Sequence, residues 1–590
     1  MNPCQTIASI QHPAVREGWL RGTAAQHNGI RGGDAFVQVD WDTAFELIVR
    51  EMHRVQADGS GLELGIGTSG RSVPQANFAA EILQVFEQEC HQVCVIDYAP
   101  VTGAPAILAK LVGAAKTKCL LDSPRTELPR YDILLNLGMR DTEPAVSTPL
   151  GRALLAGGEI IDVSPFRPAT ASNNWLPIRP GTEAAFLLAL CTELEIQDLG
   201  GVAQASSGNS SSARRRHLLH GRDGEAFDPV WAALICGLSA KKICALARKF
   251  ASSRVLINIG LSALDTPSGE QACRAGFLLS SMLRKSGPPA ETITFCAFDA
   301  KPPELNFSEP LRRVVASADD PRQASVRMAF YPSIDVFRVK PDLNQLLRRW
   351  AQLDTVIVAA EHWTATARHA DIVLPVLDTE DQPVDGKVER SSKHSGSVAK
   401  SPSAIISGLR ASLGIDLQSK TVNVNKGSEA IEPVIIEEVG ELIGFPTWHR
   451  GFEWLGSPLA RRYPIHLVKS IRRRRLIGSR AIVWLHPHDA LERGLHEGDT
   501  VRIWNGRGAC LADLGICANR LHNVAEMLPA YDYEPLVDGA PGSLDTAGVL
   551  QILVEDRSVQ GASLDCLVEI EAWRLDPPAL RVISEPRFTV

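Results

Sequence analysis

The sequence has no cysteine pair at the Cys-x-x-Cys spacing that zinc and iron–sulfur sites commonly use. Its 12 cysteines are scattered, and the closest two, Cys90 and Cys94, are separated by three residues that include His91. A zinc or iron–sulfur site would need a second such cluster, and the sequence contains none. We therefore expect no iron–sulfur cluster, and we expect most of these cysteines to be buried thiols in a reducing compartment.

Other absences exclude further classes of protein. No apolar run approaches the roughly 20 residues that a membrane-spanning helix requires. The amino terminus, MNPCQTIASIQHPAVREGW, has no basic start, apolar core or twin arginine, so we expect a cytoplasmic protein. The net charge of −7 and a single short basic cluster, Arg472–Arg475, argue against nucleic acid as a partner. The G-x-S-x-G, H-E-x-x-H and G-x-x-x-x-G-K-[ST] motifs are missing, so hydrolase and P-loop functions find no support.

The sequence does contain an alternation of strand and helix patterns over most of its 590 residues. Such a length exceeds one hydrophobic core and predicts about two to four domains. The alternation is typical of parallel sheets covered by helices on both faces. Asp40 is the expected cap of the first long helix. Apolar patterns predict strands at 62–66, 132–137, 159–163, 254–259 and 355–358, and helices at 41–55, from about 74, 148–156, 270–284 and 342–350.

From about residue 481 the pattern changes to short strands and tight turns, which predicts a small closed barrel of antiparallel strands. The fold class is therefore multidomain α/β, with doubly wound, mostly parallel sheets and a C-terminal closed β-barrel. We expect residues 1–122 and 327–455 to form one discontinuous α/β domain, 123–326 an inserted dinucleotide-binding-like α/β domain, and 456–590 the barrel domain.

Two polar segments within these bounds resemble linkers rather than parts of the packed domains. Residues 206–216 are serine-rich and then basic, which indicates a linker. Residues 381–427 are rich in serine and lysine and only weakly periodic, which indicates a surface excursion.

The stretch EHWTATARHADIVLP, residues 361–375, is the most informative local pattern. A polar turn leads into a short apolar strand that ends at Pro375. Polar side chains at the end of a strand are free to meet a nucleotide, although such a loop also serves as a plain connection. His362 and His369 lie seven residues apart, and we do not expect them to form a metal pair because the stretch runs into a strand.

This stretch resembles a segment of the molybdopterin oxidoreductases, in the branch of the biotin sulfoxide, dimethyl sulfoxide and trimethylamine N-oxide reductases. Further stretches resemble the same branch and occur in its order. They cover most of the chain except roughly 200–250 and 380–430. The chain is shorter than members of this branch usually are. The matching stretches are RGGDAFVQVDWDTAFEL at 31–47, WLPIRPGTEAAFLLAL at 175–190, GEQ at 269–271, DLN at 342–344, HPHDALERGLHEGDTVRIWNGRG at 486–508 and GASLDCLVEIE at 561–571.

The resemblance implies a bis(molybdopterin guanine dinucleotide) that holds one molybdenum, and transfer of an oxygen atom from an S- or N-oxide. The cofactor would carry the difficult chemistry, while the protein positions it. The resemblance places one nucleotide near Asp162, Ser164 and Pro165, although Asp162 as a cap of the following turn stays an open alternative. The other cofactor-binding positions that it implies are Gly138, Gly181, Thr182, Glu183 (where an aspartate is usual), Ser262, Thr364 and Asp371.

The departures from the branch lie mainly where the metal and the pterins would be. Its substrate-facing tyrosine and tryptophan are replaced by Ser69 and Arg71, so the catalytic residues stay unidentified. Its metal-binding serine is replaced by Val101, which cannot ligate a metal. Asp97 or Cys94 would be the nearby substitutes, with a surface carboxylate and a structural thiol as the alternatives. Further pterin-facing positions hold Asp335, Val336, Arg338, Val339, Lys340, Ile477, Gly478 and Gln551 in this chain.

Three functions therefore stay open, and the least favoured of them keeps the nucleotide-binding sheet for a mononucleotide alone. The first is a molybdenum-dependent oxidoreductase that acts on a small S- or N-oxide and receives electrons from a reductant. The second is a cofactor-depleted relative that serves as a structural or partner subunit and binds a protein over the uncovered cofactor funnel.

Overall fold

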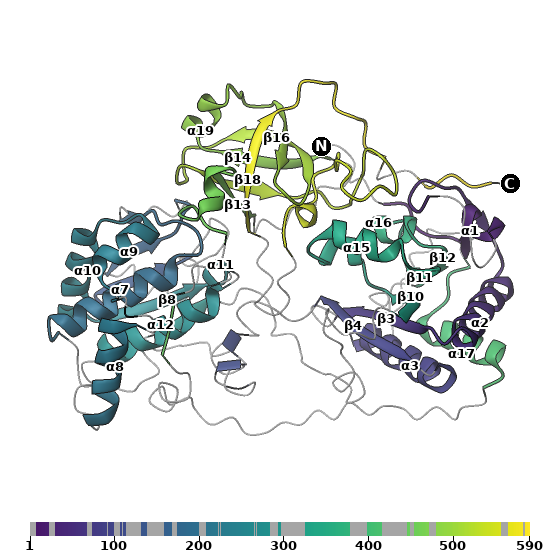
Figure 1. The fold of residues 1–590 in the computed structure, drawn as a ribbon, viewed down its shortest axis with the longest axis horizontal. Coiled ribbons are helices and arrows are strands. Elements are labelled where there is room, and N and C mark those ends of the chain that lie inside the picture. The colour runs from purple at the N-terminus through teal and green to yellow at the C-terminus, as the bar shows by residue number, and fades with distance from the viewer. Residues whose placement is uncertain are drawn as a thin grey trace, which may run out of the picture.

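The computed structural model contains two α/β lobes and a β-barrel that lies across both of them (Figure 1). We call the lobe that carries β3 and β10 the first lobe and the lobe that carries β5 and β8 the second lobe. The structure describes residues 7–22, 30–67, 73–90, 92–99, 107–108, 110–111, 113, 131–138, 158–167, 174–199, 208–221, 224, 226–264, 266, 268–283, 293–296, 325–377, 398–415, 445–448, 453–470, 479–555, 565–581 and 585–589.

The first lobe is built on a seven-stranded sheet in the order β2-β1-β12-β11-β10-β3-β4. The five strands from β12 to β4 are parallel, whereas β1 and β2 add an antiparallel edge. Two distant parts of the chain therefore share this sheet. Its strands are β1 (Ala14–Arg16), β2 (Phe36–Gln38), β3 (Gly61–Gly67), β4 (Val93–Ala99), β10 (Val326–Pro332), β11 (Thr355–Ala360) and β12 (Ile372–Pro375).

Helices cover both faces of this sheet. Three of them, α2 (Trp41–Ala57), α3 (Val73–Glu89) and α17 (Pro402–Leu413), bury apolar side chains in one core. Asp40 begins α2 as predicted, because its side chain accepts a hydrogen bond from the Thr43 amide at 2.8 Å. The short α1 (Glu17–Arg21) adds Trp19 to that core. On the opposite face lie α14 (Val336–Val339), α15 (Leu343–Trp350) and α16 (Ala365–Arg368).

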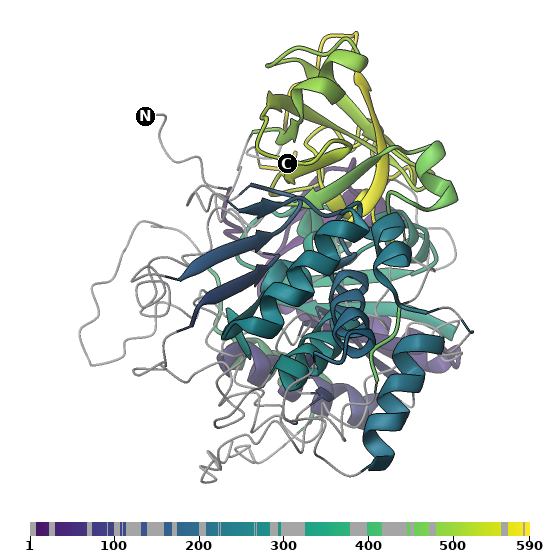
Figure 2. The same cartoon turned by 90° about the vertical axis from the view of Figure 1, so that its left-hand side faces the viewer.

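The second lobe has a five-stranded sheet in the order β7-β6-β5-β8-β9, and all its strand pairs are parallel. Its described helices pack into a separate hydrophobic core. Figure 2 shows these helices together on one side of the strands. The strands are β5 (Ile133–Leu137), β6 (Glu159–Val163), β7 (Trp175–Leu176), β8 (Val255–Gly260) and β9 (Ile293–Cys296), and the helices are α7 (Glu183–Ile196), α8 (Gly208–His220), α9 (Pro229–Cys236), α10 (Ala240–Ser252), α11 (Leu261–Leu264) and α12 (Gly269–Leu283).

The barrel is closed, in the order β13-β17-β14-β16-β15-β18. The prediction of a closed barrel is confirmed, but the prediction of purely antiparallel strands is wrong. The pairs β13–β17 and β14–β16 are parallel. In the second pair, β15 lies in sequence between the two strands and lets the chain cross over. The elements are β13 (Ile465–Lys469), β14 (Ala481–Leu485), α19 (Pro487–Glu492), β15 (Thr500–Trp504), β16 (Ala509–Ile516), β17 (Val524–Leu528) and β18 (Cys566–Ala572), with 3-10 turns η4 (Pro458–Arg461) and η5 (Leu550–Ile552).

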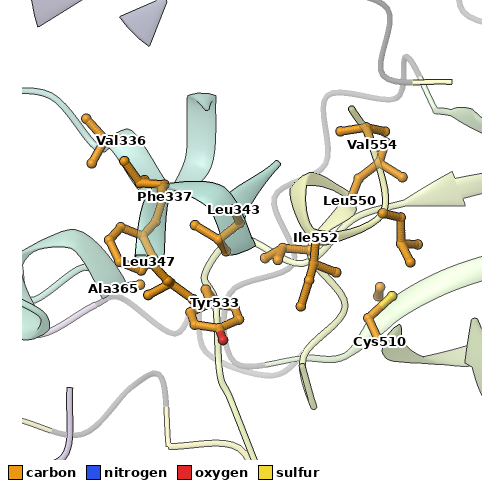
Figure 3. Packing of buried hydrophobic residues seen from close by; sticks show 14 of the residues in the cluster. Val336, Phe337, Leu343, Leu347, Ala365, Cys510, Tyr533, Leu550, Ile552 and Val554 are labelled. Carbon is orange, nitrogen blue, oxygen red and sulfur yellow. The ribbon is translucent and has the colours of Figure 1, made fainter. Parts of the chain in front are cut away.

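The barrel and the first lobe share one continuous hydrophobic core. Phe337 and Leu347 of the first lobe meet Tyr533, Leu550 and Ile552 of the barrel region in that core (Figure 3). The barrel-facing side of the first lobe is thus filled by side chains of the protein itself.

The predicted linker at 206–216 is mostly helix, since α8 begins at Gly208. Leu218 of α8 is buried, and Arg214 pairs with Glu195 of α7 at 3.1 Å. These contacts stabilise the helix despite its polar composition. The sequence pattern did not reveal them, because they are made with α7 and the core of the second lobe.

The predicted excursion at 381–427 is also wrong in part. Residues 402–413 form α17, which Ser401 caps and which buries Ile405, Ile406 and Leu409 against α2 and α3. The remainder of 381–427 lies mainly outside the described residues, as does the predicted helix at 148–156. The proposed domain boundaries stay predictions.

In the described part of the chain, no single helix has the length and apolar character to span a membrane; α9 and α10 meet that test only as a pair bent by 117°.

Candidate functional site

A row of buried polar side chains crosses the middle of the second sheet near the carboxyl ends of its strands. Asp162 of β6, Asn136 of β5 and Asn258 of β8 lie in register. The Asn136 amide donates to Asp162 Oδ1 at 2.9 Å, and the Asn258 amide donates to Asn136 Oδ1 at 3.2 Å. Central strands of a parallel sheet are usually apolar. Three polar residues at one level therefore point to a ligand-binding edge, where such sheets take up nucleotides.

The residues predicted around Asp162 lie together at this edge. Gly138 follows β5 with a φ of +66°, and its amide donates to the Val163 carbonyl at 2.9 Å. Ser164 follows β6, and its Oγ accepts from the Phe166 amide at 3.2 Å. The carbonyl of Pro165 accepts from Leu521 of the barrel at 2.8 Å. The strand end is thus held by the turn itself and by the barrel.

The stretch from Gly181 to Glu183, which the resemblance implies contacts the guanine, lies at the junction of β7 and α7, and we call it the guanine turn. Gly181 has a φ of +74°, and its carbonyl accepts from the Ser268 hydroxyl at 2.6 Å. Thr182 is fully buried and donates its hydroxyl to the Arg179 carbonyl at 2.6 Å. Glu183 is buried in the first turn of α7, where a carboxylate interacts favourably with the helix dipole. Ser262 lies in α11, which begins directly after β8.

A narrow cavity of about 20 Å³ lies between this turn and the barrel, enough for about one water molecule. Gly181 and Ser268 line it on the lobe side, and His466 of β13 lines it on the barrel side. His466 is buried, and within the described part of the chain neither ring nitrogen has a hydrogen-bond partner. Burial lowers the pKa of His466 to about 4, so the ring is neutral at pH 7. It offers one donor and one acceptor to a ligand.

A larger cavity of about 330 Å³ lies at the same junction between the second lobe and the barrel. Arg179, which precedes the guanine turn, and Leu521, which donates to Pro165, both line it. Cavities of about 300 Å³ or more are typical of small-molecule sites. The two cavities and the unpaired ring nitrogens of His466 therefore lie next to the residues that are predicted to bind a nucleotide.

His466 was not predicted from the sequence. A histidine within the alternating strand YPIHLVK carries no local signal of a ligand. Only the contact of β13 with a turn almost 300 residues earlier could have revealed it.

The two predicted residues of the first lobe serve the protein itself. Thr364 caps α16 by accepting from the Ala367 amide at 3.4 Å. Asp371 is fully buried and accepts from Arg16 at 2.8 Å, from Arg31 at 2.6 Å and from the Val356 amide at 2.8 Å. The carboxylate of Asp371 is therefore occupied by two arginines and one backbone amide.

The predicted substitutes for the metal ligand both lie on β4. Cys94 is buried in the core that the first lobe shares with the barrel, whereas Asp97 is partly exposed nearer the end of the strand. Residues three apart on a strand point to opposite faces, so Cys94 and Asp97 do not face one site together. Ser69, Arg71 and Val101 lie outside the described residues.

A buried charge on β3 lies beside Cys94 and was not anticipated. Glu63 accepts from the hydroxyls of Tyr98 at 2.5 Å and Tyr331 at 3.0 Å, and it pairs with Arg349. Burial raises the pKa of both tyrosines, which keeps them as donors. The network neutralises Glu63 within the protein.

Further substitutions at pterin-facing positions gather where the first lobe meets the barrel. Asp335, after β10, accepts a hydrogen bond from the Thr366 hydroxyl at 2.5 Å. Burial raises the pKa of Asp335 and of Asp532, and the charge of Asp335 raises that of Asp532 further. Gln551 donates to the carbonyl of Arg338. Val336 and Phe337 are buried in the shared core (Figure 3).

Comparisons with known proteins agree with this geometry. A family model described as molybdopterin oxidoreductase matches residues 10–403, and a molybdopterin dinucleotide binding domain model matches residues 461–528. The chain is 24% identical to a biotin sulfoxide reductase of Cereibacter sphaeroides, over 95% of this chain and 93% of that protein. It is 22% identical to a dimethyl sulfoxide/trimethylamine N-oxide reductase of the same organism and to a trimethylamine-N-oxide reductase of Haemophilus influenzae, each over 98% of this chain and 88% of the relative.

The structure is similar to that of an acetylene hydratase from Pelobacter acetylenicus, with a TM-score of 0.59 and 15% identity over 95% of this chain and 92% of that chain. This similarity supports the fold. The alignment with the biotin sulfoxide reductase runs over 703 positions, more than the 590 residues of this chain. The shortening is therefore spread through internal gaps rather than confined to one end.

Proposed function

The chain belongs to the molybdopterin oxidoreductase family, and on this premise we propose that it removes an oxygen atom from a small S- or N-oxide. We further propose that its molybdenum is held by a bis(molybdopterin guanine dinucleotide). Two protons and two electrons convert the oxide to the sulfide or amine and water, so a separate reductant is required. When bound, the cofactor would supply the oxygen-atom transfer and the electron storage.

The observation that carries this proposal is the polar edge of the second sheet beside the two cavities. Asp162 and Ser164 are the residues expected to hold a nucleotide at the strand end. The turn at Gly181 and the neutral ring of His466 lie beside that edge, and among the described residues the ring nitrogens of His466 have no hydrogen-bond partner. These groups would offer donors and acceptors to a nucleotide bound at the junction.

The protein ligand to the metal is proposed from β4. Asp97 suits this role better than Cys94, since Asp97 is the more exposed and lies nearer the carboxyl end of the strand. Thr364 and Asp371 are assigned to the folding of the first lobe rather than to the cofactor, because their side chains already have protein partners.

The remaining expectations are part of the same proposal. The substrate is a small oxide, the location is the cytoplasm, and the shortened funnel offers a surface for a protein partner. We do not adopt the cofactor-free partner subunit as a second function, since no observation of the described residues favours it.

A dye-linked assay tests the proposed activity. The protein would be purified from a host that makes the cofactor, and oxidation of reduced viologen would be followed after addition of biotin sulfoxide, dimethyl sulfoxide or trimethylamine N-oxide. We expect turnover with at least one oxide, and none for protein made in a host that lacks the cofactor. A molybdenum-loaded protein that reduces no oxide would contradict the proposed activity.

A further inference from the structure

The barrel carries a histidine cluster that the proposed oxidoreductase function does not use. His486 precedes α19, Asp489 lies within it, and His522 lies in the segment between β16 and β17. The candidate ligand atoms of these three residues all lie within 4.8 Å of one another. The rings of His486 and His522 are 3.8 Å apart between centroids.

Asp489 is the fixed member of the cluster. Its side chain is 1% exposed, and its Oδ2 accepts from the Asn523 amide at 2.8 Å. Its other oxygen, Oδ1, lies 3.6 Å from His522 Nδ1. A carboxylate held by a backbone amide on one oxygen presents the other in a defined direction, as the oriented ligands of metal sites do.

The two histidines are suited to the same ion. His486 is only partly exposed, and an imidazole nitrogen is a common ligand of transition-metal ions. The His488 amide donates to His486 Nδ1 at 3.2 Å, a long hydrogen bond that a metal bond can replace. His488 itself lies close by, with its ring 4.8 Å from that of His522.

We propose that His486, Asp489 and His522 bind one divalent transition-metal ion of the zinc type. Two imidazoles and one carboxylate are a common protein ligand set for zinc, with a remaining position for water or a further side chain. The ion would join α19 to the segment before β17.

The position of this site gives the ion a structural consequence. The segment before β17 pairs with the chain just after β6: the Leu521 amide donates to Pro165 at 2.8 Å, and the Arg167 amide donates to Asn519 at 3.0 Å. His522 also lines the 330 Å³ cavity between the second lobe and the barrel. A metal at His522 would therefore stiffen the barrel segment that holds the end of β6.

Zinc binding to the full-length protein tests the proposal. Equilibrium dialysis against Zn²⁺ would compare the wild type with a variant that combines His486→Asn and His522→Gln. Asparagine keeps a good helix cap at position 486. His496→Gln is the matched control, because His496 also lies near a carboxylate, Asp499, at 3.7 Å, but is 85% exposed and outside the cluster.

We expect the wild type and His496→Gln to bind one Zn²⁺ that the double variant binds about tenfold or more weakly. Zinc should also raise the thermal midpoint of the wild type and of His496→Gln, but not that of the double variant. An anomalous diffraction peak between His486 and His522 in zinc-soaked crystals would locate the ion. Equal zinc binding by all three proteins, or an ion located elsewhere, would overturn the proposal.

Discussion

At the scale of single residues, His369 and His466 are both buried but have different surroundings. His369 Nδ1 donates to the Ala365 carbonyl at 2.8 Å, and the ring lies against Phe337, with ring centroids 4.6 Å apart. Its ring is so close to Gly32 that a Cβ there would lie 2.4 Å from Nε2. His369 therefore fills a packed site, whereas His466 faces a cavity.

The lowered pKa of His466 predicts a pH-dependent stability. The folded state resists protonation down to about pH 4, whereas the unfolded histidine takes up a proton near pH 6.5. The contribution of His466 to the free energy of unfolding is therefore complete above pH 6.5 and is lost between pH 6.5 and pH 4. The loss amounts to about 3 kcal/mol.

Urea unfolding at pH 7.5 and pH 5 checks this prediction. His466→Gln should lose less stability on acidification than the wild type, and His496→Gln should behave as the wild type does. The comparison with the wild type matters because buried Asp545, whose pKa is raised to about 6 by burial, contributes with the opposite sign. Parallel pH profiles for His466→Gln and the wild type would contradict the account of His466.

Asp162 and Asp371 are both buried carboxylates, and their partners predict different consequences of substitution. Asp371→Asn removes one of the two carboxylates that pair with buried Arg16, the other being Asp34, so the free energy of unfolding should fall by about 3 kcal/mol. Asp162→Asn can still accept from Asn136, so the loss of stability should stay within about 1 kcal/mol. The nucleotide content of the purified protein should fall for Asp162→Asn only.

Urea midpoints and the guanine nucleotide released by acid treatment separate the two outcomes. A folded Asp371→Asn protein that has lost nucleotide, beside an Asp162→Asn protein that retains it, would reverse the assignment.

The sequence predicted the position of the residues at the end of β6, because the local order of strand, polar residue and turn determines where they lie, and their binding of a nucleotide stays a prediction. It could not predict the role of Asp371, since Arg16 lies 355 positions away. Nor could it predict that His466 lines a cavity, since that cavity forms only where the barrel meets the second lobe. Partners brought together only by tertiary packing leave no local pattern.

At the scale of elements, the long periodic helices and buried strands were predictable, and the polar helices were not. The predicted strands at 62–66, 159–163 and 355–358 correspond to β3, β6 and β11. α8 was predicted as a linker because serines and arginines dominate its sequence. Its stability comes from the Arg214–Glu195 pair and from buried Leu218.

α17 packs very closely on α2, and this contact predicts a specific sensitivity. A Cβ at Gly408 would lie 2.2 Å from the ring of Phe45. Gly408→Ala should therefore lower the free energy of unfolding by about 1–3 kcal/mol, although alanine usually stabilises a helix interior by about 1 kcal/mol. Ser407→Ala, on the exposed side of α17, should change it by less than about 0.5 kcal/mol. Chemical unfolding of both variants checks this, and a stabilised Gly408→Ala protein would refute the packing.

At the scale of the whole molecule, the hydrophobic cores define the cooperative units. The first lobe and the barrel share one core, whereas the second lobe has its own. The barrel meets the second lobe across cavities, backbone hydrogen bonds and a small apolar cluster of Phe166, Val468 and Val524. Both cavities thus lie between the barrel and the second lobe, beside the residues that are predicted to bind a nucleotide.

Hydrogen exchange should report these units. Phe337→Ala removes a buried ring from the shared core, at a cost of about 3–5 kcal/mol, and should speed exchange in β10, β11 and the barrel strands together. Phe186→Ala in α7 is the matched variant, and it should speed exchange in the second lobe alone. If both variants speed hydrogen exchange equally in the first lobe, the second lobe and the barrel, the two cores do not define separate cooperative units.

The direct measurement of the proposed cofactor is the metal and nucleotide content of protein purified from a host that makes molybdopterin guanine dinucleotide. Metal analysis and chromatography of the acid-released nucleotides should find about one molybdenum and two guanosine monophosphates per chain. Protein from that host that is folded but carries neither molybdenum nor guanine nucleotide would contradict the proposed oxidoreductase.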